Sequence, residues 1–497
     1  MKEQYILAVD QSTSGTKAIL FDRNGDLIKR ATFDHTQYYP QAGWVEHDPE
    51  EIYGNTQRAI RQVLMESGVC ENEIASLAIS NQRETVVVWD KSTGKPVYPA
   101  IVWQCGRAAG ICRTLEEKGH GAMVKEKTGL VLSPYFSAAK IKWILDCVKG
   151  AREKAEAGQL LFGTMDSWLV WNLTGGKVHA TDYSNASRTQ LFNIMDLGWD
   201  EELLRIFTIP QSMAPEVKYS DELFGHAGDA AGFSRDIPIA GVMGDSHAAL
   251  FGQHCFEPGM AKATYGTGSS VMMHIGRQKR ASQKGLVTSL AWGMGGQVEY
   301  VFEGNINCAG AAIKWLADGL HLIPDSCSAG AIAASVPDNG GVYMVPAFTG
   351  LGAPYWHNDA KASIWGMTLG ANKAHIVRAA EESIAYQIKD ILDLMVAESG
   401  ATLKELRVDG GPTRDDFLMQ FQADIAAVRV VRGKVAELSA LGAAFMAGLA
   451  VGIWSTKESM QTLRQEDKAY ECQMGAIERA QLYGGWVAAV RRTLTDY

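Results

Sequence analysis

Three turns in this chain combine glycine with acidic or hydroxyl side chains, and each follows a short apolar run. They are centred on Asp10, Thr267 and the pair Gly410-Gly411. Such turns let backbone N–H groups and Ser or Thr hydroxyls approach a polyphosphate, while a carboxylate can hold Mg²⁺. Together they could line a cleft that binds a nucleotide across two domains. The alternative for each is an ordinary tight turn without a ligand.

A second polar set has the residue types that bind neutral hydroxyl groups. Its members are Arg83, Glu84, Tyr135 and Asp245. A guanidinium donates and a carboxylate accepts hydrogen bonds in a fixed geometry. Asp245, at the end of an apolar run, could also take the proton of an attacking hydroxyl. The structural alternatives are a surface ion pair between Arg83 and Glu84, a helix N-cap at Asp245, and core positions for Tyr135 and Trp103.

Other classes of site are disfavoured. The sequence has neither a Gly-x-x-x-x-Gly-Lys-Ser/Thr loop nor a strand-linked Gly-x-Gly-x-x-Gly, and it lacks serine-hydrolase and HExxH patterns. The net charge of -9 argues against a general nucleic-acid or anionic-membrane surface, so we expect a small-molecule partner. The eight cysteines are scattered without zinc-type spacing, which favours reduced structural thiols.

The length of 497 residues predicts two large domains, which we place at residues 1–253 and 254–497. In the first domain the sequence predicts a hairpin over residues 5–22 and strands over 27–33, 75–80 and 238–242. It also predicts a helix that starts at Asp48 and another over 246–251. Residues 261–273 repeat the opening pattern of strand, hydroxyl-and-glycine turn and strand, which suggests that the second domain is built like the first. A long helix over 376–398 and a short strand over 406–408 follow.

Nothing in the sequence indicates a membrane or a secretory route. The longest apolar run, residues 441–454, is too short to span a bilayer and contains small residues that would let a buried helix pack closely. The first residues lack the apolar core of a signal peptide. We therefore expect a cytoplasmic protein.

Several ordered stretches resemble one known family along nearly the whole chain. They include Asp10-Gln11-Ser12-Thr13-Ser14, Asn81-Gln82-Arg83-Glu84-Thr85, Ile101-Val102-Trp103, Pro134-Tyr135-Phe136-Ser137, Gly266-Thr267-Gly268, residues 346–356 and Asp409-Gly410-Gly411. The chain resembles the FGGY carbohydrate kinases and, among them, is most similar to the glycerol kinases. The resemblance implies an α/β fold of two actin-like, ribonuclease-H-like domains that close an interdomain cleft over ATP, Mg²⁺ and a polyol.

The resemblance also implies roles for individual residues. Asp245 would be the catalytic base, Arg83, Glu84 and Tyr135 would bind substrate hydroxyls, and Trp103 would pack against the substrate carbons. Asp10 would lie near Mg²⁺. The positions that match nucleotide-binding residues of the family are Thr13, Ser14, Lys17, Thr267, Gly310, Gly411 and Asp415. Lys17 stands where the glycerol kinases usually have Arg, and Asp415 where the family commonly has Asn.

Two departures bear on the acceptor. Glycerol kinases usually carry Gln at the position of Ser246 and an aromatic residue at that of Ser270, so both positions here are smaller and hydroxylated. Glycerol would lose apolar contact worth about 1–2 kcal/mol. We therefore expect a four- or five-carbon polyol or ketose as the acceptor, with glycerol itself as the alternative. From another class, the alternative is a non-enzymatic actin-like or chaperone-like nucleotide-binding protein. Either could form a homo-oligomer.

Overall fold

The opening hairpin lies in the middle of a six-stranded sheet. The computed structural model describes residues 4–357, 359–435, 437–463 and 466–495. As predicted, β1 (Tyr5–Gln11) and β2 (Gly15–Phe21) pair antiparallel. The sheet continues with β5 (Ile74–Asn81) and β14 (Ile237–Gly244), both parallel to β1's direction, and ends with β3 (Leu27–Asp34) and β13 (His226–Ala227). The carboxyl ends of β1, β5 and β14 therefore meet at one edge.

A seven-stranded sheet repeats this arrangement in the second half of the chain. Here β15 (Met260–Tyr265) pairs antiparallel with β16 (Ser269–Gly276) and parallel with β21 (Glu405–Asp409), as β1 does with β2 and β5. The other strands are β17 (Val287–Met294), β18 (Gln297–Ile306), β22 (Val430–Gly433) and β23 (Glu466–Tyr470). The predicted structural repeat is confirmed.

The predicted helix signals also hold. Asp48 caps α1 (Pro49–Ser67), accepting a hydrogen bond from Glu50 N, and α12 (Lys373–Ser399) ends at Gly400 in the left-handed conformation. Helix α1 buries one apolar face against the first sheet, whereas α12 is buried all round along its middle, between the second sheet and neighbouring helices. The second lobe also contains α10 (Gly310–Asp318), α11 (Ala329–Ala333), α13 (Asp416–Ala426) and α15 (Ala476–Thr495).

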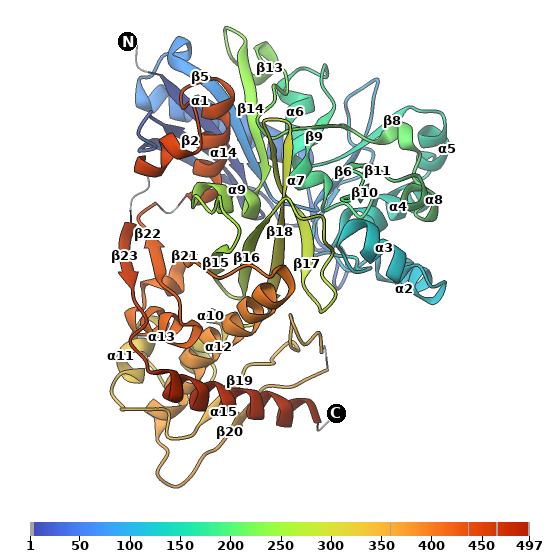
Figure 1. Ribbon diagram of the computed structural model, residues 1–497. Helices are drawn as coiled ribbons and strands as arrows, with labels where there is room; N and C mark the ends of the chain where they lie inside the picture. The colour runs from blue at the N-terminus through green and yellow to red at the C-terminus, as the bar shows by residue number, and fades with distance from the viewer. Residues whose placement is uncertain (1–3, 358, 436, 464–465, 496–497) are drawn as a thin grey trace.

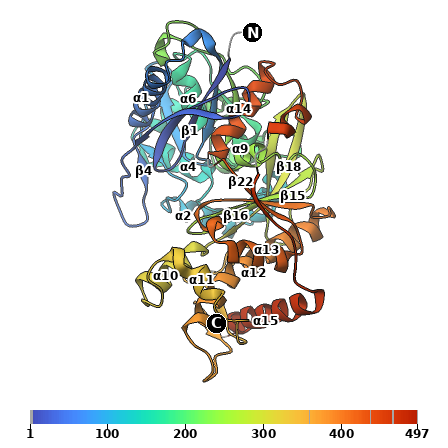
Figure 2. The same cartoon turned by 90° about the vertical axis from the view of Figure 1, so that its left-hand side faces the viewer.

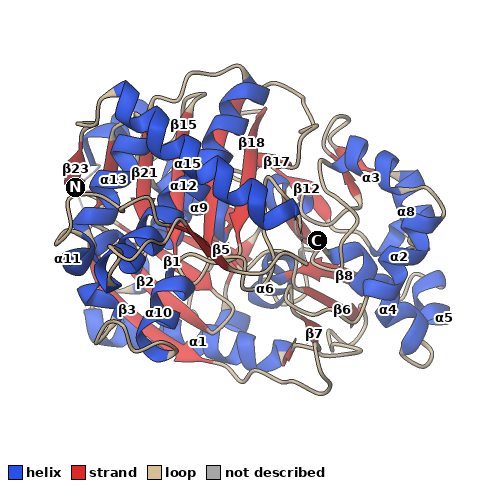
Figure 3. Cartoon of the chain, turned by 90° about the horizontal axis from the view of Figure 1, so that it is seen from below, coloured by secondary structure: helices blue, strands red, loops and turns tan. Residues whose placement is uncertain are grey.

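A smaller sheet extends the first lobe to one side. It contains β4 (Glu46–His47), β7 (Ala100–Ile101), β6 (Val86–Asp90) and β8 (Leu160–Thr164). Figure 3 shows the helices α2 (Ala109–Glu117), α4 (Ser137–Cys147), α5 (Ala151–Glu156) and α8 (Glu201–Ile206) gathered beside it. This region carries Trp103 and Tyr135, so its packing positions part of the expected acceptor site.

One helix from the second half of the chain returns to the first lobe. Figures 1 and 2 show α14 (Leu438–Ala450) lying beside α9 (Asp245–Gly252) and the first sheet, whereas α12, α13 and α15 lie in the other lobe. A Cβ on Gly442 would lie 1.8 Å from Ala248 O, so only glycine allows this close packing. The predicted close approach of this helix is confirmed, but the two lobes are not simple halves of the chain.

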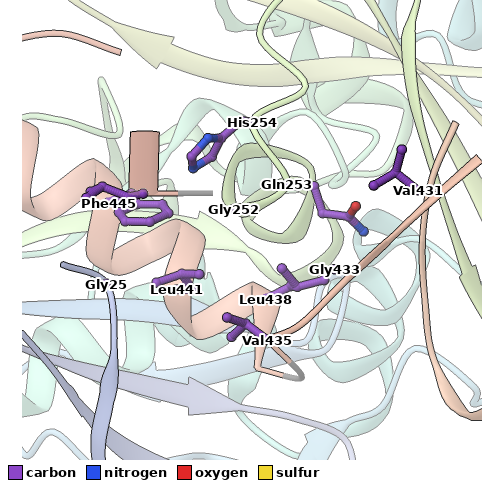
Figure 4. Close-up of a pocket in the computed structure, with 11 residues that line it drawn as sticks. Gly25, Gly252, Gln253, His254, Val431, Gly433, Val435, Leu438, Leu441 and Phe445 are labelled. Atoms are coloured by element: carbon purple, nitrogen blue, oxygen red, sulfur yellow. The ribbon is translucent and has the colours of Figure 1, made fainter. Parts of the chain in front are cut away.

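A small cavity lies where α14, α9 and β22 meet. Its volume is about 30 Å³. Figure 4 shows Leu438, Leu441 and Phe445 of α14 on one side and the segment Gly252-Gln253-His254 on another. The chain passes from the first lobe to the second along that segment, so this apolar contact holds the crossing point in place.

Two further expectations concern the cysteines and membrane-spanning segments. All eight cysteines are free thiols. Across the described residues, no helix has both the length and the apolar character needed to cross a membrane.

Candidate active site

The edge where the first sheet's parallel strands end carries three of the predicted residues. Asp10 lies opposite Ser80 in the register of β1 and β5, and Gly244, which precedes Asp245, lies opposite Asn81. Arg83 follows β5 by two residues. Strand register alone therefore brings Asp10, Arg83 and Asp245 to one edge, where ligands of such sheets bind.

Arg83 is the centre of a buried charge cluster that spans both lobes. Its Nε lies 3.1 Å from Asp245 Oδ1, and its Nη1 and Nη2 donate to the two carboxylate oxygens of Glu303 at 3.2 and 2.9 Å. Arg188 contacts the same Glu303 at 2.8 Å and donates to Glu84 at 2.5 Å. The surface ion pair between Arg83 and Glu84 is thus wrong, because both side chains are buried and each has another partner.

Opposing charges offset burial for Glu303 and the two arginines, whereas burial raises the pKa of Glu84 despite its contact with Arg188. Burial acts to raise the pKa of Glu303, but Arg188 and Arg83 hold it below its ordinary value. Burial acts to lower the pKa of Arg83, but Glu303, Glu84 and Asp245 raise it well above the usual range. Two arginines and their acids therefore present fixed donors and acceptors at the site.

Asp245 is the accessible carboxylate of this cluster. Its side chain is 38% exposed, whereas Glu303 is fully buried. Helix α9 takes Gly244 as its N-cap and has no side-chain cap, so the alternative of Asp245 as the N-cap is wrong. Arg83 Nε and Ser246 N both contact Oδ1 of Asp245, which orients the carboxylate.

Trp103 and Tyr135 form an aromatic wall near the first predicted phosphate turn. Their ring centroids lie 5.4 Å apart with the planes tilted by 60°. Trp103 Nε1 donates to Thr13 Oγ1 at 2.9 Å, which ties the wall to that turn. Lys140, fully buried, donates to the backbone carbonyls of Tyr135 and Phe136 and so fixes the loop that carries Tyr135.

The two serines that depart from the family pattern lie near Arg83. Ser246 is the second residue of α9, next to Asp245, and its backbone N–H lies 2.6 Å from Asp245 Oδ1. Ser270, in β16, donates to Glu303 Oε1 at 3.4 Å and is partly buried. Both positions therefore adjoin the charge cluster, although they belong to different lobes.

The first phosphate turn exposes Ser14 and partly exposes Thr13, whereas Lys17 is held by a residue from far along the chain. Lys17 Nζ lies 2.6 Å from Glu437 Oε2 and 3.8 Å from Asp10 Oδ2. Arg30 contacts the other oxygen of Glu437 at 2.5 Å. Glu437 immediately precedes α14, so the returning helix places a carboxylate beside Lys17, the cation that is predicted to bind phosphate.

The predicted nucleotide residues of the second lobe gather around a separate opening. Thr267 O accepts hydrogen bonds from Ala309 and Ala311 N–H, which joins this turn to the start of α10. Gly310, Gly411 and Asp415 line a cavity of about 690 Å³ with walls from α10, α11, α12 and α13. The cavity is large enough for a nucleoside.

Asp10 is a buried carboxylate whose surroundings suit a bound cation. Burial raises its pKa to about 6, Lys17 acts in the opposite direction, and Asp245 raises it further. In the described part of the chain, no three His, Cys, Asp or Glu side chains form a group that could hold a metal ion. Mg²⁺ typically takes one or two carboxylates together with substrate phosphates, so Asp10 fits that mode of binding.

Sequence reasoning missed three important residues of the site. These are Glu303, Arg188 and Glu437, and each contacts a partner that lies more than 100 residues away in the sequence. The available signal for Glu303 was a charged side chain within an otherwise apolar strand, Tyr300-Val301-Phe302-Glu303. A glutamate in such a strand is rarely fully buried unless it is paired.

Comparisons with known proteins agree with this arrangement. The family models "FGGY family of carbohydrate kinases, N-terminal domain" and "C-terminal domain" match residues 5–252 and 261–451. Glycerol kinase of Alkaliphilus metalliredigens is 53% identical over 492 residues, covering 99% of this chain and 98% of that protein. Glycerol kinase of Bacillus subtilis is 51% identical over 492 residues and covers 99% of each chain.

Solved structures of carbohydrate kinases share the fold of this chain. The crystal structure of Plasmodium falciparum glycerol kinase with ADP has a TM-score of 0.94 and 37% identity, covering 99% of this chain and 98% of that one. Xylulose kinase from Lactobacillus acidophilus, with a TM-score of 0.89 and 21% identity over 99% and 98% of the two chains, shares the fold. The predicted two-domain sugar-kinase fold is confirmed, and the chain is a phosphotransferase rather than a filament or chaperone subunit. It belongs to the FGGY family of carbohydrate kinases.

Proposed function

We propose that this enzyme transfers the γ-phosphoryl group of ATP to a terminal hydroxyl of glycerol. The observation that carries the proposal is the contact between Arg83 and the accessible carboxylate of Asp245 at the sheet edge, beside the phosphate turn of the first lobe. Relatives named glycerol kinase, at 51–54% identity over the full chain, favour glycerol over the four- or five-carbon acceptor that the two serines suggested.

Asp245 acts as the general base. Arg83 and the Ser246 N–H both contact Oδ1, so Oδ2 is the oxygen that takes the hydroxyl proton. As the proton leaves, the hydroxyl oxygen forms a bond to the γ-phosphorus and the bond from that phosphorus to the ADP oxygen breaks. Arg83 contacts the carboxylate of Asp245 and holds it in position.

The acceptor binds between the charge cluster and the aromatic wall. Arg83 donates to one hydroxyl and Glu84 accepts from another, while Trp103 and Tyr135 pack against the carbon chain. Thr13, hydrogen-bonded to Trp103, lies in the phosphate turn, so the acceptor and the transferred group are held next to each other. Closure of the two lobes would exclude water as a competing acceptor. We place the boundary between them near residue 254, except that α14 returns to the first lobe.

Asp10 is the residue that would hold Mg²⁺, through the ion's remaining water ligands or directly. When bound, the ion neutralises charge on the phosphates. On the nucleotide side, Ser14, Thr267 and Lys17 contact phosphate oxygens. For Lys17 this requires partial exchange of its Glu437 partner for the phosphate.

A longer polyol is the second candidate acceptor, and one observation favours it. Ser270 contributes a hydroxyl 3.4 Å from Glu303, and Ser246 follows Asp245 in α9, so both positions carry a short side chain with hydrogen-bonding capacity. A four- or five-carbon chain would use that extra capacity.

A coupled ADP-release assay tests both candidates. The purified protein is assayed with ATP and Mg²⁺ against glycerol, erythritol, the pentitols, dihydroxyacetone and four- to six-carbon ketoses. Glycerol should give the highest kcat/KM. A clearly higher kcat/KM for a longer acceptor would replace glycerol with the second candidate. ADP release that does not depend on any acceptor would contradict both.

A further inference from the structure

The cavity of about 690 Å³ in the second lobe contains an acid that the reaction does not use. Alongside the predicted nucleotide residues Gly310, Gly411 and Asp415, its wall includes Glu381, which lies in α12. Apolar side chains of Ile313 and others complete the wall. The inference below rests on the proposed function in taking this cavity as the nucleotide-base pocket.

Glu381 is buried without a protein partner for one of its oxygens. The residue is 3% exposed, and its Oε2 has no hydrogen-bond partner among the described residues. The adjacent Glu382 differs in this respect, since it pairs with Arg378 at 2.8 Å and accepts from Asn339 at 3.0 Å. An unpaired buried polar atom destabilises a fold, and the residue that carries this one lines a cavity in which a bound ligand can supply a partner.

The other two acids that line this cavity, Asp415 and Asp416, already have partners in the protein. Asp416 accepts hydrogen bonds from Lys468 at 2.7 Å and from the hydroxyl of Tyr470. Asp415 Oδ1 accepts hydrogen bonds from Phe417 N at 2.9 Å and Leu418 N at 3.2 Å, which caps α13. A Cβ on Gly330 would lie 2.1 Å from both Asp415 carboxylate oxygens, so α11 packs directly on this carboxylate. Asp415 therefore joins α11 to α13, and Glu381 is the acid of this wall that has a buried oxygen without a partner in the described chain.

The protonation state of Glu381 suits a heterocyclic base. Burial raises its pKa well above the ordinary value, and the neighbouring Asp415 carboxylate raises it further. A neutral carboxyl group has one O–H donor and a carbonyl acceptor. The edge of adenine offers the complementary pair, a ring nitrogen that accepts and an exocyclic amine that donates.

We propose that Glu381 is a base-contacting residue, whose carboxyl group hydrogen-bonds the polar edge of the adenine ring and so contributes to nucleotide affinity. The contact gives the carboxyl group of Glu381 a partner, which the described part of the chain does not give its Oε2. It also assigns separate tasks to the acids of the pocket: Asp415 and Asp416 fix the wall through partners in the protein, and Glu381 recognises the base.

Calorimetric titration of ADP into the full-length protein, without acceptor, tests this assignment. E381Q keeps a donor and an acceptor and should bind ADP within about threefold of the unmodified protein. E381L removes both and should weaken ADP binding at least tenfold, while its thermal midpoint without nucleotide is equal or higher, because an unpaired buried acid is gone. ADP binding by E381L that equals that of the unmodified protein would overturn the proposal.

A control and a ligand-side change complete the test. Glu398 lies on the same helix and also has a buried oxygen without a hydrogen-bond partner in the described chain, but it does not line the cavity. E398Q and E398L should leave ADP affinity unchanged. Should E381L fail to fold, the affinities of the unmodified protein for ADP, purine riboside diphosphate and 7-deaza-ADP are compared instead. The first analogue lacks the exocyclic amine and the second lacks a ring nitrogen. The unmodified protein should bind at least one analogue tenfold more weakly than ADP, and equal affinity for all three would reject the contact.

The binding readout separates this inference from the proposed function. A protein that binds ADP through Glu381 but phosphorylates an acceptor other than glycerol would contradict only the proposed acceptor. A protein that phosphorylates glycerol with unchanged nucleotide affinity in E381L would contradict only the base contact.

Discussion

Arg83 and Glu303 join the two lobes through a bidentate contact. Arg83 follows a strand of the first sheet and Glu303 lies within a strand of the second, yet the guanidinium reaches both carboxylate oxygens, at 2.9 and 3.2 Å. Arg188 contacts the same carboxylate, so one fully buried acid compensates two buried arginines. The residue that orients Asp245 is thus held by the opposite lobe.

Replacing Glu303 should strongly destabilise the protein. Glu303→Leu leaves Arg83 and Arg188 without their shared partner, and the free energy of unfolding should fall by about 3–5 kcal/mol. Glu303→Gln, which keeps hydrogen-bonding atoms, should cost less. Urea denaturation measures both. The control is Glu257→Gln, which removes an exposed ion pair with Lys404 and should cost less than about 1 kcal/mol. Equal losses for Glu303→Leu and the control would show that the cluster is not structural.

Replacing Asp245 should separate catalysis from binding. Asp245→Asn keeps the side-chain shape and a hydrogen-bond acceptor but cannot take the hydroxyl proton at neutral pH. We expect kcat to fall by about 10²–10⁴-fold. Affinity for ADP, measured by calorimetry, should change less than twofold, because Asp245 is not among the proposed nucleotide-binding residues. Near-normal turnover in this variant would remove Asp245 as the base.

The sequence predicts those parts of the site whose interacting residues lie close together along the chain. The hairpin around Asp10 and the cap at Asp48 are local patterns, and the structure has both where they were expected. Glu303 and Glu437 were missed because their partners lie 220 and 420 residues away, and no local pattern encodes such a pair. Family resemblance located Asp245 and Arg83, but it could not show that the second lobe supplies their electrostatic partner.

Enlarging Ser246 and Ser270 tests whether these positions set acceptor length. Ser246→Gln with Ser270→Phe fills space beside Asp245 and Glu303, so the ratio of kcat/KM for glycerol to that for erythritol should rise by about tenfold. This corresponds to roughly 1.4 kcal/mol of selectivity, within the range for one or two methylene-sized contacts. The single variants, assayed alongside, show which serine contributes. An unchanged ratio in all three variants would mean that neither serine faces the acceptor.

The buried amine of Lys140 should give the protein a measurable dependence on pH. Burial lowers the pKa of Lys140 to about 7 from 10.5. In the unfolded chain the amine keeps its proton to about pH 10. Between pH 7 and 10 the unfolded state therefore binds more protons than the folded state, so the free energy of unfolding should rise with pH by up to a few kcal/mol.

Lys140→Met should abolish this rise, and Lys142→Met, on the same helix but in a surface pair with Asp146, should retain it. Because Lys140 holds the carbonyls of Tyr135 and Phe136, its loss should also raise KM for the acceptor several-fold while KM for ATP stays within twofold. Urea denaturation at pH 7 and pH 9.5, with steady-state kinetics at pH 7.5, measures both effects. If Lys140→Met follows the pH dependence of the unmodified protein, the amine is protonated in the folded state. Equal rises in both KM values would assign Lys140 a general structural role, rather than control of the Tyr135 loop.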